Sequence, residues 1–133
     1  MIIETKIMEI ENHIDERGSL CVIEGNNFVF NIERVFYTFN VKKDDIRGQH
    51  ANRDTEFFLI SVSGSCKIRV IDVNNNIKDF TLDEPTKGLY IPKMIWKEMY
   101  DFSDDCVLLS LCNSPYNSEE YINNLETFLE VAK

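Results

Sequence analysis

The sequence predicts an all-β domain of antiparallel strands, a sandwich or barrel, with one C-terminal helix. Short apolar or alternating segments recur along most of the chain, turn-forming groups separate them, and helical spacing appears only at the end. The chain has 133 residues, of which 44% are hydrophobic and 28% charged. This is the size and composition of one globular domain, so we expect residues 1–133 to form a single domain.

Nine segments have strand character. In chain order they are KIMEI (6–10), SLCVIE (19–24), ERVFYTF (33–39), EFFLISV (56–62), CKIRVIDV (66–73), IKDFTL (77–82), GLYIP (88–92), IWKEMY (95–100) and CVLLSLC (106–112). The turn signals between them are DERG (15–18), EGNN (24–27), KKDD (42–45), SGS (63–65), NNN (74–76), DEP (83–85) and SDD (103–105). Strands at such intervals, without helices between them, favour an antiparallel arrangement.

The last segment, SEEYINNLETFLEVAK (118–133), predicts a helix of about four turns. Its apolar residues fall at helical spacing: Tyr121, Leu125, Phe128, Leu129 and Ala132. Asn117, followed three residues later by Glu120, resembles an N-cap with its acid at N3. We expect the apolar stripe to cover a sheet.

The charge of the chain limits the classes of partner. With 14 Lys and Arg against 23 Asp and Glu, the formal net charge is −9, which disfavours binding to nucleic acids or to anionic membranes. An anionic ligand would need a local basic pocket. The N-terminus has no signal-peptide pattern and no segment is long and apolar enough to span a membrane, so a cytoplasmic protein is expected. The four cysteines lack paired short spacing and are expected to be buried, reduced thiols.

One histidine stands in RGQHANRDTEFF (47–58), a polar run that leads into an apolar segment. Residues two apart share a face of a regular strand, so His50, Asn52, Asp54 and Glu56 would project together. A polar face inside a barrel must be hydrogen-bonded or wet, as in a ligand cavity. The alternative is a solvated strand end before the core begins at Phe57.

We expect no metal at this histidine. Small barrels often bind metals through two histidines spaced HxH, a glutamate and a histidine on a later strand. Here Asn52 takes the place of the second histidine, and Trp96 and Lys97 occupy the later position. The other histidine, His13, lies in a polar N-terminal stretch expected to be a turn. His50 with one carboxylate is a poor ligand set.

A base is the other chemical role open to His50. An imidazole with a pKa of about 6.5 can take a carbon-bound proton at neutral pH and return it elsewhere, if a neighbour stabilises the enolate. Arg47 and Arg53 flank it, and Tyr37 comes from the preceding strand segment. From these residues alone, a buried polar histidine without catalytic function remains an alternative.

The chain resembles the sugar nucleotide 3,4-ketoisomerases over nearly its whole length. The matching stretches, in order, are DERGSLCVIE, ERVFYTFN, RGQHAN, SGSCKIRV, DEPTKGLYIPKMIWKEM, DFSDDCVLLSL and YNSEEYINNLETF. The resemblance implies a cupin-type jelly roll and a homodimer that exchanges N-terminal strands. It also implies isomerisation of dTDP-4-keto-6-deoxy-D-glucose to a 3-keto sugar, without metal or organic cofactor. The product would serve the biosynthesis of 3-amino-3,6-dideoxy sugars of surface glycans.

The same resemblance implies roles for individual residues. His50, the first histidine of the family's His-Ala-His, is the base. Tyr37 shuttles the hydroxyl proton between the two sugar oxygens, or joins arginine donors in stabilising the developing charge. Arg34 and Arg47 are expected to bind the diphosphate. The other substrate-binding positions are Arg17, Asn52, Trp96 and Lys97.

Three positions depart from the family pattern. The family usually has a second histidine where this chain has Asn52, a tyrosine pair where it has Phe36 and Tyr37, and a glutamine where it has Phe57. Asparagine can orient a hydroxyl but cannot transfer a proton at neutral pH. If one base suffices, His50 carries the reaction alone.

Two further positions concern the configuration of the product at C4. Arg17 and Lys97 match places near the sugar that vary within the family. Arg17 resembles the galacto-forming type, and a long cation at Lys97 resembles the gluco-forming type. We expect mainly the galacto product.

Two other functions are compatible with the sequence. The missing second histidine fits a cupin that binds sugar nucleotides without catalysis. A jelly-roll 3,5-epimerase would act on the same substrate, but the histidine and aspartate pair of that family is not recognisable here.

Overall fold

The computed structural model describes residues 2–25 and 28–131. Its strands are β1 (Lys6–Glu9), β2 (Glu11–Asp15), β3 (Gly18–Val22), β4 (Arg34–Phe39), β5 (Arg47–Asn52), β6 (Phe57–Ser63), β7 (Cys66–Ile71), β8 (Ile77–Leu82), β9 (Lys87–Ile91), β10 (Trp96–Tyr100), β11 (Val107–Cys112) and β12 (Tyr121–Ile122). Its helices are η1 (Ile2–Glu4), η3 (Ser118–Glu120) and α1 (Leu125–Val131).

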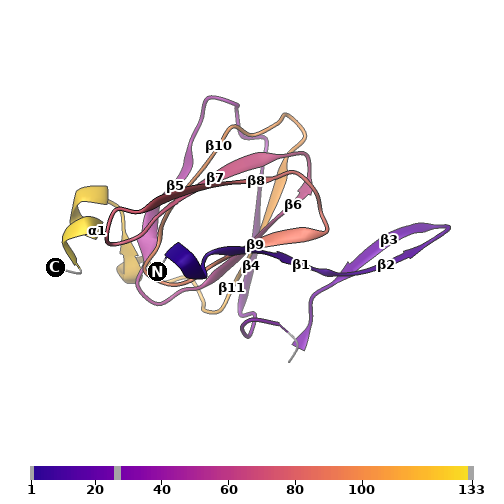
Figure 1. Cartoon of the computed structure of the whole chain (residues 1–133), viewed down its shortest axis with the longest axis horizontal. Coiled ribbons are helices and arrows are strands. Elements are labelled where there is room, and N and C mark those ends of the chain that lie inside the picture. The colour runs from indigo at the N-terminus through magenta and orange to yellow at the C-terminus, as the bar shows by residue number, and fades with distance from the viewer. Residues whose placement is uncertain (1, 26–27, 132–133) are drawn as a thin grey trace.

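Two antiparallel sheets face each other (Figure 1). The first sheet has the order β1-β9-β6-β11-β4, and the second sheet has the order β12-β5-β10-β7-β8. The predicted all-β antiparallel class with one C-terminal helix is therefore confirmed. Strand neighbours such as β9 and β6 are distant in sequence, as in a jelly roll rather than a meander.

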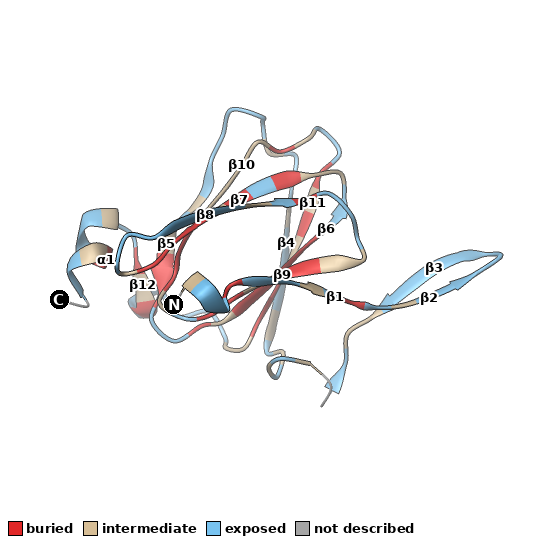
Figure 2. Ribbon diagram, viewed as in Figure 1, coloured by how far each residue is buried: buried red, intermediate tan, exposed pale blue. Residues whose placement is uncertain are grey.

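The core between the sheets follows from strict alternation along the strands. In β6, Phe57 and Leu59 point inward to this core, and Phe58 and Ile60 pack on the outer face of the first sheet. Besides Phe57 and Leu59, the buried core between the sheets contains Cys66, Ile68, Val70, Leu82, Leu89, Ile91, Ile95, Phe102, Cys106, Leu108 and Cys112. Figure 2 shows this buried layer inside the barrel, with the solvent-facing loops exposed.

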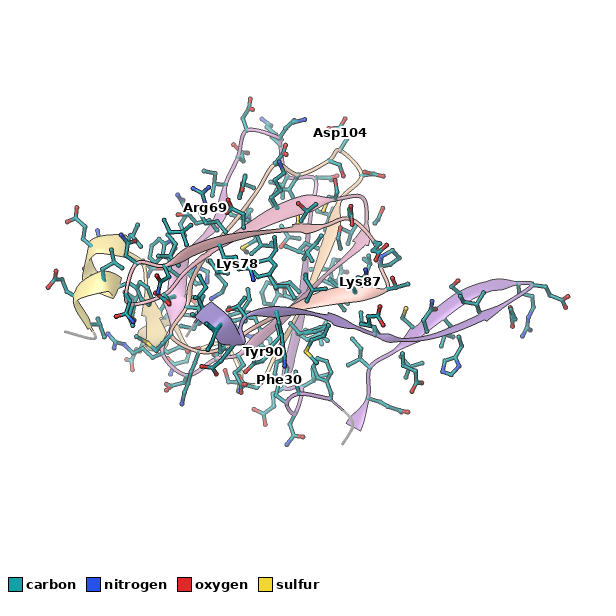
Figure 3. All side chains as sticks on the ribbon, in the orientation of Figure 1. Phe30, Arg69, Lys78, Lys87, Tyr90 and Asp104 are labelled. Carbon is teal, nitrogen blue, oxygen red and sulfur yellow. The ribbon has the colours of Figure 1, made fainter. Side chains whose placement is uncertain are left out.

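The hairpin of β2 and β3 leaves the barrel and projects away from it (Figure 1). Lys87, labelled in Figure 3, pairs with Glu9 at the end of β1, where the hairpin departs. The side chains of Ile14 and Leu20 are 74% and 58% exposed on this hairpin. The polar stretch around His13 was expected to be a turn. That expectation was wrong, because pairing with β3 gives it strand structure.

The C-terminal segment contains a shorter helix than predicted. Residues 118–120 form a 3-10 helix that Asn117 caps, and Tyr121 and Ile122 pair with Asn52 and Ala51 of β5. Helix α1 begins only at Leu125, where the Asn124 side chain accepts a hydrogen bond from the backbone N–H of Thr127 at 2.9 Å. Pairing with the sheet edge thus outweighs the helical pattern of the first turn. Ala132 lies outside the described residues.

Helix α1 covers the outer face of the second sheet, as expected for its apolar stripe. Phe128 is fully buried, and its ring centroid lies 6.2 Å from that of Trp96. Ala51, Ile71 and Ile122 complete this cluster. Three of the four cysteines are buried as predicted, but Cys21 is exposed on the hairpin. Among the described residues, no helix has the length and apolar character needed to cross a membrane.

Candidate active site

A bulge in β5 determines which side chains reach the interior. Arg47 lies opposite Met99 and His50 opposite Lys97, with one extra residue, Gln49, between the two registers. Met99 packs on the core and Lys97 is buried, so Arg47 and His50 both lie on the interior side although they are three residues apart. A regular strand of this length would place them on opposite faces.

Glycine at position 48 makes the bulge sterically feasible. Gly48 has φ +82°, and Gln49 has φ +60°. A Cβ at Gly48 would come within 2.9 Å of the Lys97 carbonyl oxygen and of the Met99 sulfur. Both the backbone conformation and the close approach therefore require glycine.

His50 is held as a neutral base. Its Nδ1 lies 3.1 Å from the carbonyl oxygen of Gly48. Because that oxygen only accepts, Nδ1 carries the ring proton and Nε2 keeps its lone pair. Burial, and secondly the nearby Lys97 ammonium, lower the pKa of His50 to about 4. Its ring packs on Tyr121, with the ring centroids 4.7 Å apart.

Lys97 is buried beside this histidine. It is 2% exposed, and its Nζ donates a hydrogen bond to Asn52 Oδ1 at 3.0 Å. The same ammonium lies 4.0 Å from the centroid of the Phe57 ring. Burial lowers the pKa of Lys97 to about 7. Both protonation states of the amine are therefore accessible at neutral pH.

Arg34 brings a second cation from the first sheet. Its Nη1 donates to the Tyr121 hydroxyl at 3.4 Å, which joins the edge strands of the two sheets. The guanidinium lies 5.7 and 5.8 Å from the ring centroids of Phe36 and Tyr116. Its Nε and Nη2 are buried and have no hydrogen-bond partner among the described residues. Buried guanidinium donors without partners fit an anionic ligand.

Glu120 fixes the connection that follows β5. Its Oε1 accepts hydrogen bonds from the backbone N–H groups of Asp54 and Thr55 at 2.9 and 3.0 Å, and its Oε2 accepts one from the Thr55 hydroxyl. Burial raises the pKa of Glu120, but these hydrogen bonds outweigh it and lower the pKa below the usual value. The helical pattern of residues 118–133 placed Glu120 and Tyr121 in a predicted helix, so neither was predicted as a site residue.

The polar face predicted on a regular strand ends at Asn52. Asp54 is exposed, and Glu56 instead accepts hydrogen bonds from the Tyr90 hydroxyl and the Asn113 amide. Figure 3 labels Tyr90 on β9 of the first sheet. The expectation that Asp54 and Glu56 share a face with His50 was wrong, because β5 stops at Asn52 and a turn follows.

Two predicted site residues lie away from His50 of the same chain. Tyr37 is 63% exposed and pairs with Leu109 on the outer face of the first sheet, where its ring stacks on Phe39 with a centroid distance of 6.0 Å. Arg17 lies at the tip of the projecting hairpin and forms an exposed ion pair with Asp15 at 3.0 Å.

The structure also places Trp96 and the two arginines that flank His50, Arg47 and Arg53, in different surroundings. Trp96 lies on the opposite face of β10 from Lys97, packed under α1, and its Nε1–H donates to Glu98 at 3.0 Å. Arg47 is exposed on the interior side, and Arg53 is exposed in the turn after β5. The structure therefore brings together His50, Asn52, Lys97 and Arg34, with Arg47 at the margin.

In the described part of the chain, no three histidine, cysteine or acidic side chains gather in a way that could hold a metal ion. The described site instead combines one neutral imidazole with two cations. Such a set can remove a carbon-bound proton and stabilise the resulting negative charge on oxygen.

Comparison with known proteins gives the same chemistry. The family model described as "FdtA: WxcM-like, C-terminal" matches residues 3–133. The TDP-4-oxo-6-deoxy-alpha-D-glucose-3,4-oxoisomerase of Aneurinibacillus thermoaerophilus is 41% identical over 126 residues, which are 94% of this chain and 90% of that protein. Two solved structures from Campylobacter jejuni are also similar. WlaRA, a TDP-fucose-3,4-ketoisomerase, is 40% identical, with TM-score 0.91 over 97% of this chain and 96% of that chain.

The second structure, WlaRB, is a TDP-quinovose 3,4-ketoisomerase. It is 40% identical, with TM-score 0.89 over 94% of this chain and 96% of that chain. The family match covers almost every residue, and the fold agrees over the same length. The chain therefore belongs to the FdtA/WxcM-like family of sugar 3,4-ketoisomerases, which have the cupin-like fold.

Proposed function

We propose that this protein moves the ketone of dTDP-4-keto-6-deoxy-D-glucose from C4 to C3, with His50 as the base. The observation that carries the proposal is the state of His50. Its Nδ1 is committed to the Gly48 carbonyl, no described residue donates to its Nε2 lone pair, and the ring is neutral at pH 7. The similar enzymes are named for this reaction on TDP sugars.

The chemistry of the substrate suits one base among cations. The C4 ketone acidifies the proton on C3, so an imidazole can remove it. The negative charge then spreads over the two neighbouring oxygens, where the Lys97 ammonium lowers its energy. Return of the proton to C4 completes the shift. The product, a 3-keto sugar, suits an aminotransferase that makes 3-amino-3,6-dideoxy sugars.

Arg34 is our first choice for the diphosphate, and Arg47 is the second. The partnerless Nε and Nη2 of Arg34 can engage two phosphate oxygens at once. Arg47 lies on the same side of β5 as His50 and is exposed enough to meet the nucleotide outside the barrel. In a chain of net charge −9, these two guanidinium groups supply local positive charge for a dianionic ligand.

The product is proposed to have mainly the galacto configuration at C4, because Arg17 resembles the galacto-forming type. Overall similarity does not decide this point. WlaRA and WlaRB are each 40% identical to this chain, yet fucose and quinovose differ in configuration at C4.

The active form is proposed to be a homodimer that exchanges the β2–β3 hairpin. The hairpin projects from the barrel (Figures 1 and 2), and its side chains Leu20 and Ile14 are exposed. The outer face of the first sheet is apolar. A groove of about 340 Å³ on that face is lined by apolar side chains including Ile60, Val35 and Leu109. Exchange would also take Arg17 from its isolated position to the barrel of a second copy.

The test is incubation with dTDP-4-keto-6-deoxy-D-glucose in deuterated water. A new 3-keto sugar with deuterium at C3 or C4 is expected, and the His50→Asn variant should show neither. Coupling to a 3-aminotransferase would identify the epimer. Binding of TDP without exchange or product would instead favour a non-catalytic binding protein, and deuterium at C5 would favour a 3,5-epimerase.

A further inference from the structure

The proposed isomerisation moves two protons. One leaves C3 and arrives at C4, and the other leaves the hydroxyl on C3 and arrives at the oxygen on C4. His50 accounts for the first transfer. The second transfer needs a group that can both donate and accept a proton beside those oxygens.

Within one chain, this second transfer is open neither to Tyr37, the group that the family resemblance suggested for it, nor to Asn52, which replaces the family's second histidine. Tyr37 is on the outer face of the first sheet, and its ring packs against Phe39. Asn52 is buried on the interior side, but an amide does not exchange a proton at neutral pH. Within one chain, the oxygen-to-oxygen transfer therefore falls to another side chain.

Lys97 occupies the required place. It is the register partner of His50 across β5 and β10, and its Nζ is bound to Asn52, the residue that replaces the family's second histidine. In the described structure Lys97 forms no ion pair, and the nearby Glu120 carboxylate accepts its hydrogen bonds from Asp54 and Thr55. An ammonium has three protons, and one is used on Asn52.

We propose that Lys97 carries the hydroxyl proton from the oxygen on C3 to the oxygen on C4, and that Asn52 positions its amine. This inference rests on the proposed function. A lysine from the neighbouring strand would thus transfer a proton where Asn52, the replacement for the family's second histidine, cannot.

The steps balance without any further reactant. As His50 Nε2 takes the proton from C3, the electron pair forms the C3–C4 double bond, and the oxygen on C4 takes a proton from the Lys97 ammonium. The neutral amine then takes the proton of the hydroxyl on C3. That oxygen becomes the new carbonyl, and the double-bond electrons accept the proton of His50 at C4. Both side chains return to their starting states.

The electrostatics support this sequence. A charged Lys97 lowers the pKa of His50, so the two groups resist being charged together. In the proposed steps the imidazolium forms only as the ammonium gives up its proton. Burial sets the pKa of Lys97 at about 7, so both its forms are accessible at neutral pH.

The test compares Lys97→Arg with the wild type. Arginine keeps a cation that stabilises the enolate, but it does not deprotonate at these pH values. Deuterium exchange at C3 should stay within about 10-fold of wild type, and formation of the 3-keto product should fall by ~100-fold or more. A matched control is Lys67→Arg, on the outer face of the second sheet, which should change neither rate.

A second variant separates proton transfer from structural support. Adding Asn52→His to Lys97→Arg restores a group that can exchange protons, so product formation should recover at least ~10-fold. The pH profile gives an independent readout. The wild-type rate should fall above about pH 7, and this alkaline limb should be absent in Lys97→Arg. The other titratable or charged groups near Lys97 are His50, Arg34, Cys112 and Glu120.

The outcomes are distinct. No isomerisation by the wild type would overturn the proposed function itself. Equal rates in the wild type and Lys97→Arg would overturn the role of Lys97. Parallel loss of exchange and product, without recovery by Asn52→His, would show a structural role only and would also reject the inference.

Discussion

Replacing Lys97 by methionine should make the protein more stable while it impairs the reaction. Burial lowers the pKa of Lys97 from 10.5 to about 7. At about 1.4 kcal/mol for each pKa unit, this corresponds to ~5 kcal/mol of folding free energy lost at neutral and lower pH. The sign follows from proton counts, since the unfolded lysine holds a proton between about pH 7 and 10.5 that the folded lysine has lost.

The penalty is therefore full below about pH 7, shrinks as the pH rises and is gone above 10.5. Methionine has a similar shape and no charge, so the variant escapes the penalty. It also leaves Asn52 Oδ1 without its donor, which costs about 1–3 kcal/mol. The net gain at pH 6.5 should be ~2–4 kcal/mol, or an increase of ~1–2 M in the urea midpoint.

The assay is urea unfolding at one fixed protein concentration, followed by the fluorescence of the single tryptophan, Trp96. The gain should be large at pH 6.5 and much smaller at pH 9.5. A variant less stable than wild type at pH 6.5, or an equal gain at both pH values, would refute the reasoning. Lys67→Met, which removes only an exposed ion pair with Asp101, should change stability by less than ~0.5 kcal/mol.

Three further predictions concern the hairpin, the bulge and the buried carboxylate. Leu20→Glu on the hairpin should weaken the dimer, as measured by sedimentation velocity. Ile77→Glu, at a similarly exposed residue on β8, should not weaken it. Equal behaviour of the two variants would argue against hairpin exchange. Gly48→Ala should lower the free energy of unfolding by about 1–3 kcal/mol in urea unfolding and reduce deuterium exchange at C3, because a Cβ strains the backbone and meets Lys97. Wild-type values for both measurements would contradict this account of the bulge. Glu120→Gln should cost about 1–2 kcal/mol at pH 7. Because the folded pKa of Glu120 is lowered, its contribution exists above the unfolded pKa of about 4.5 and is lost as the pH falls through the folded value, so a difference that persists at pH 3 would contradict it.

Alternation along the chain was enough to predict most of the barrel. Segments such as residues 56–62 and 106–112 alternate between two apolar faces, and they became β6 and β11 at the centre of the first sheet. The hairpin strand at Glu11–Asp15 was missed because it has few apolar residues. Its structure comes from backbone pairing with β3 alone.

Part of the site was also predictable from the sequence. His50 and Asn52 stood out because they belong to a polar run that directly precedes an apolar segment. Lys97 was found only through family resemblance, because its burial and its bond to Asn52 depend on the register of β10 against β5. Glu120 was hidden by a helical pattern that tertiary pairing overrides.

Because β5 contains a bulge, deleting one residue at this point and inserting one would have different effects on the site. Removing Gln49 would leave Arg47 and His50 two residues apart, and ordinary alternation would then give them the same face without any left-handed backbone. Adding a residue would instead turn one of them away from the interior unless a further irregularity formed. Relatives one residue shorter at this point could keep the same inward-facing pair, and a graft of the histidine onto another barrel would not need the glycine if it copied the shorter spacing.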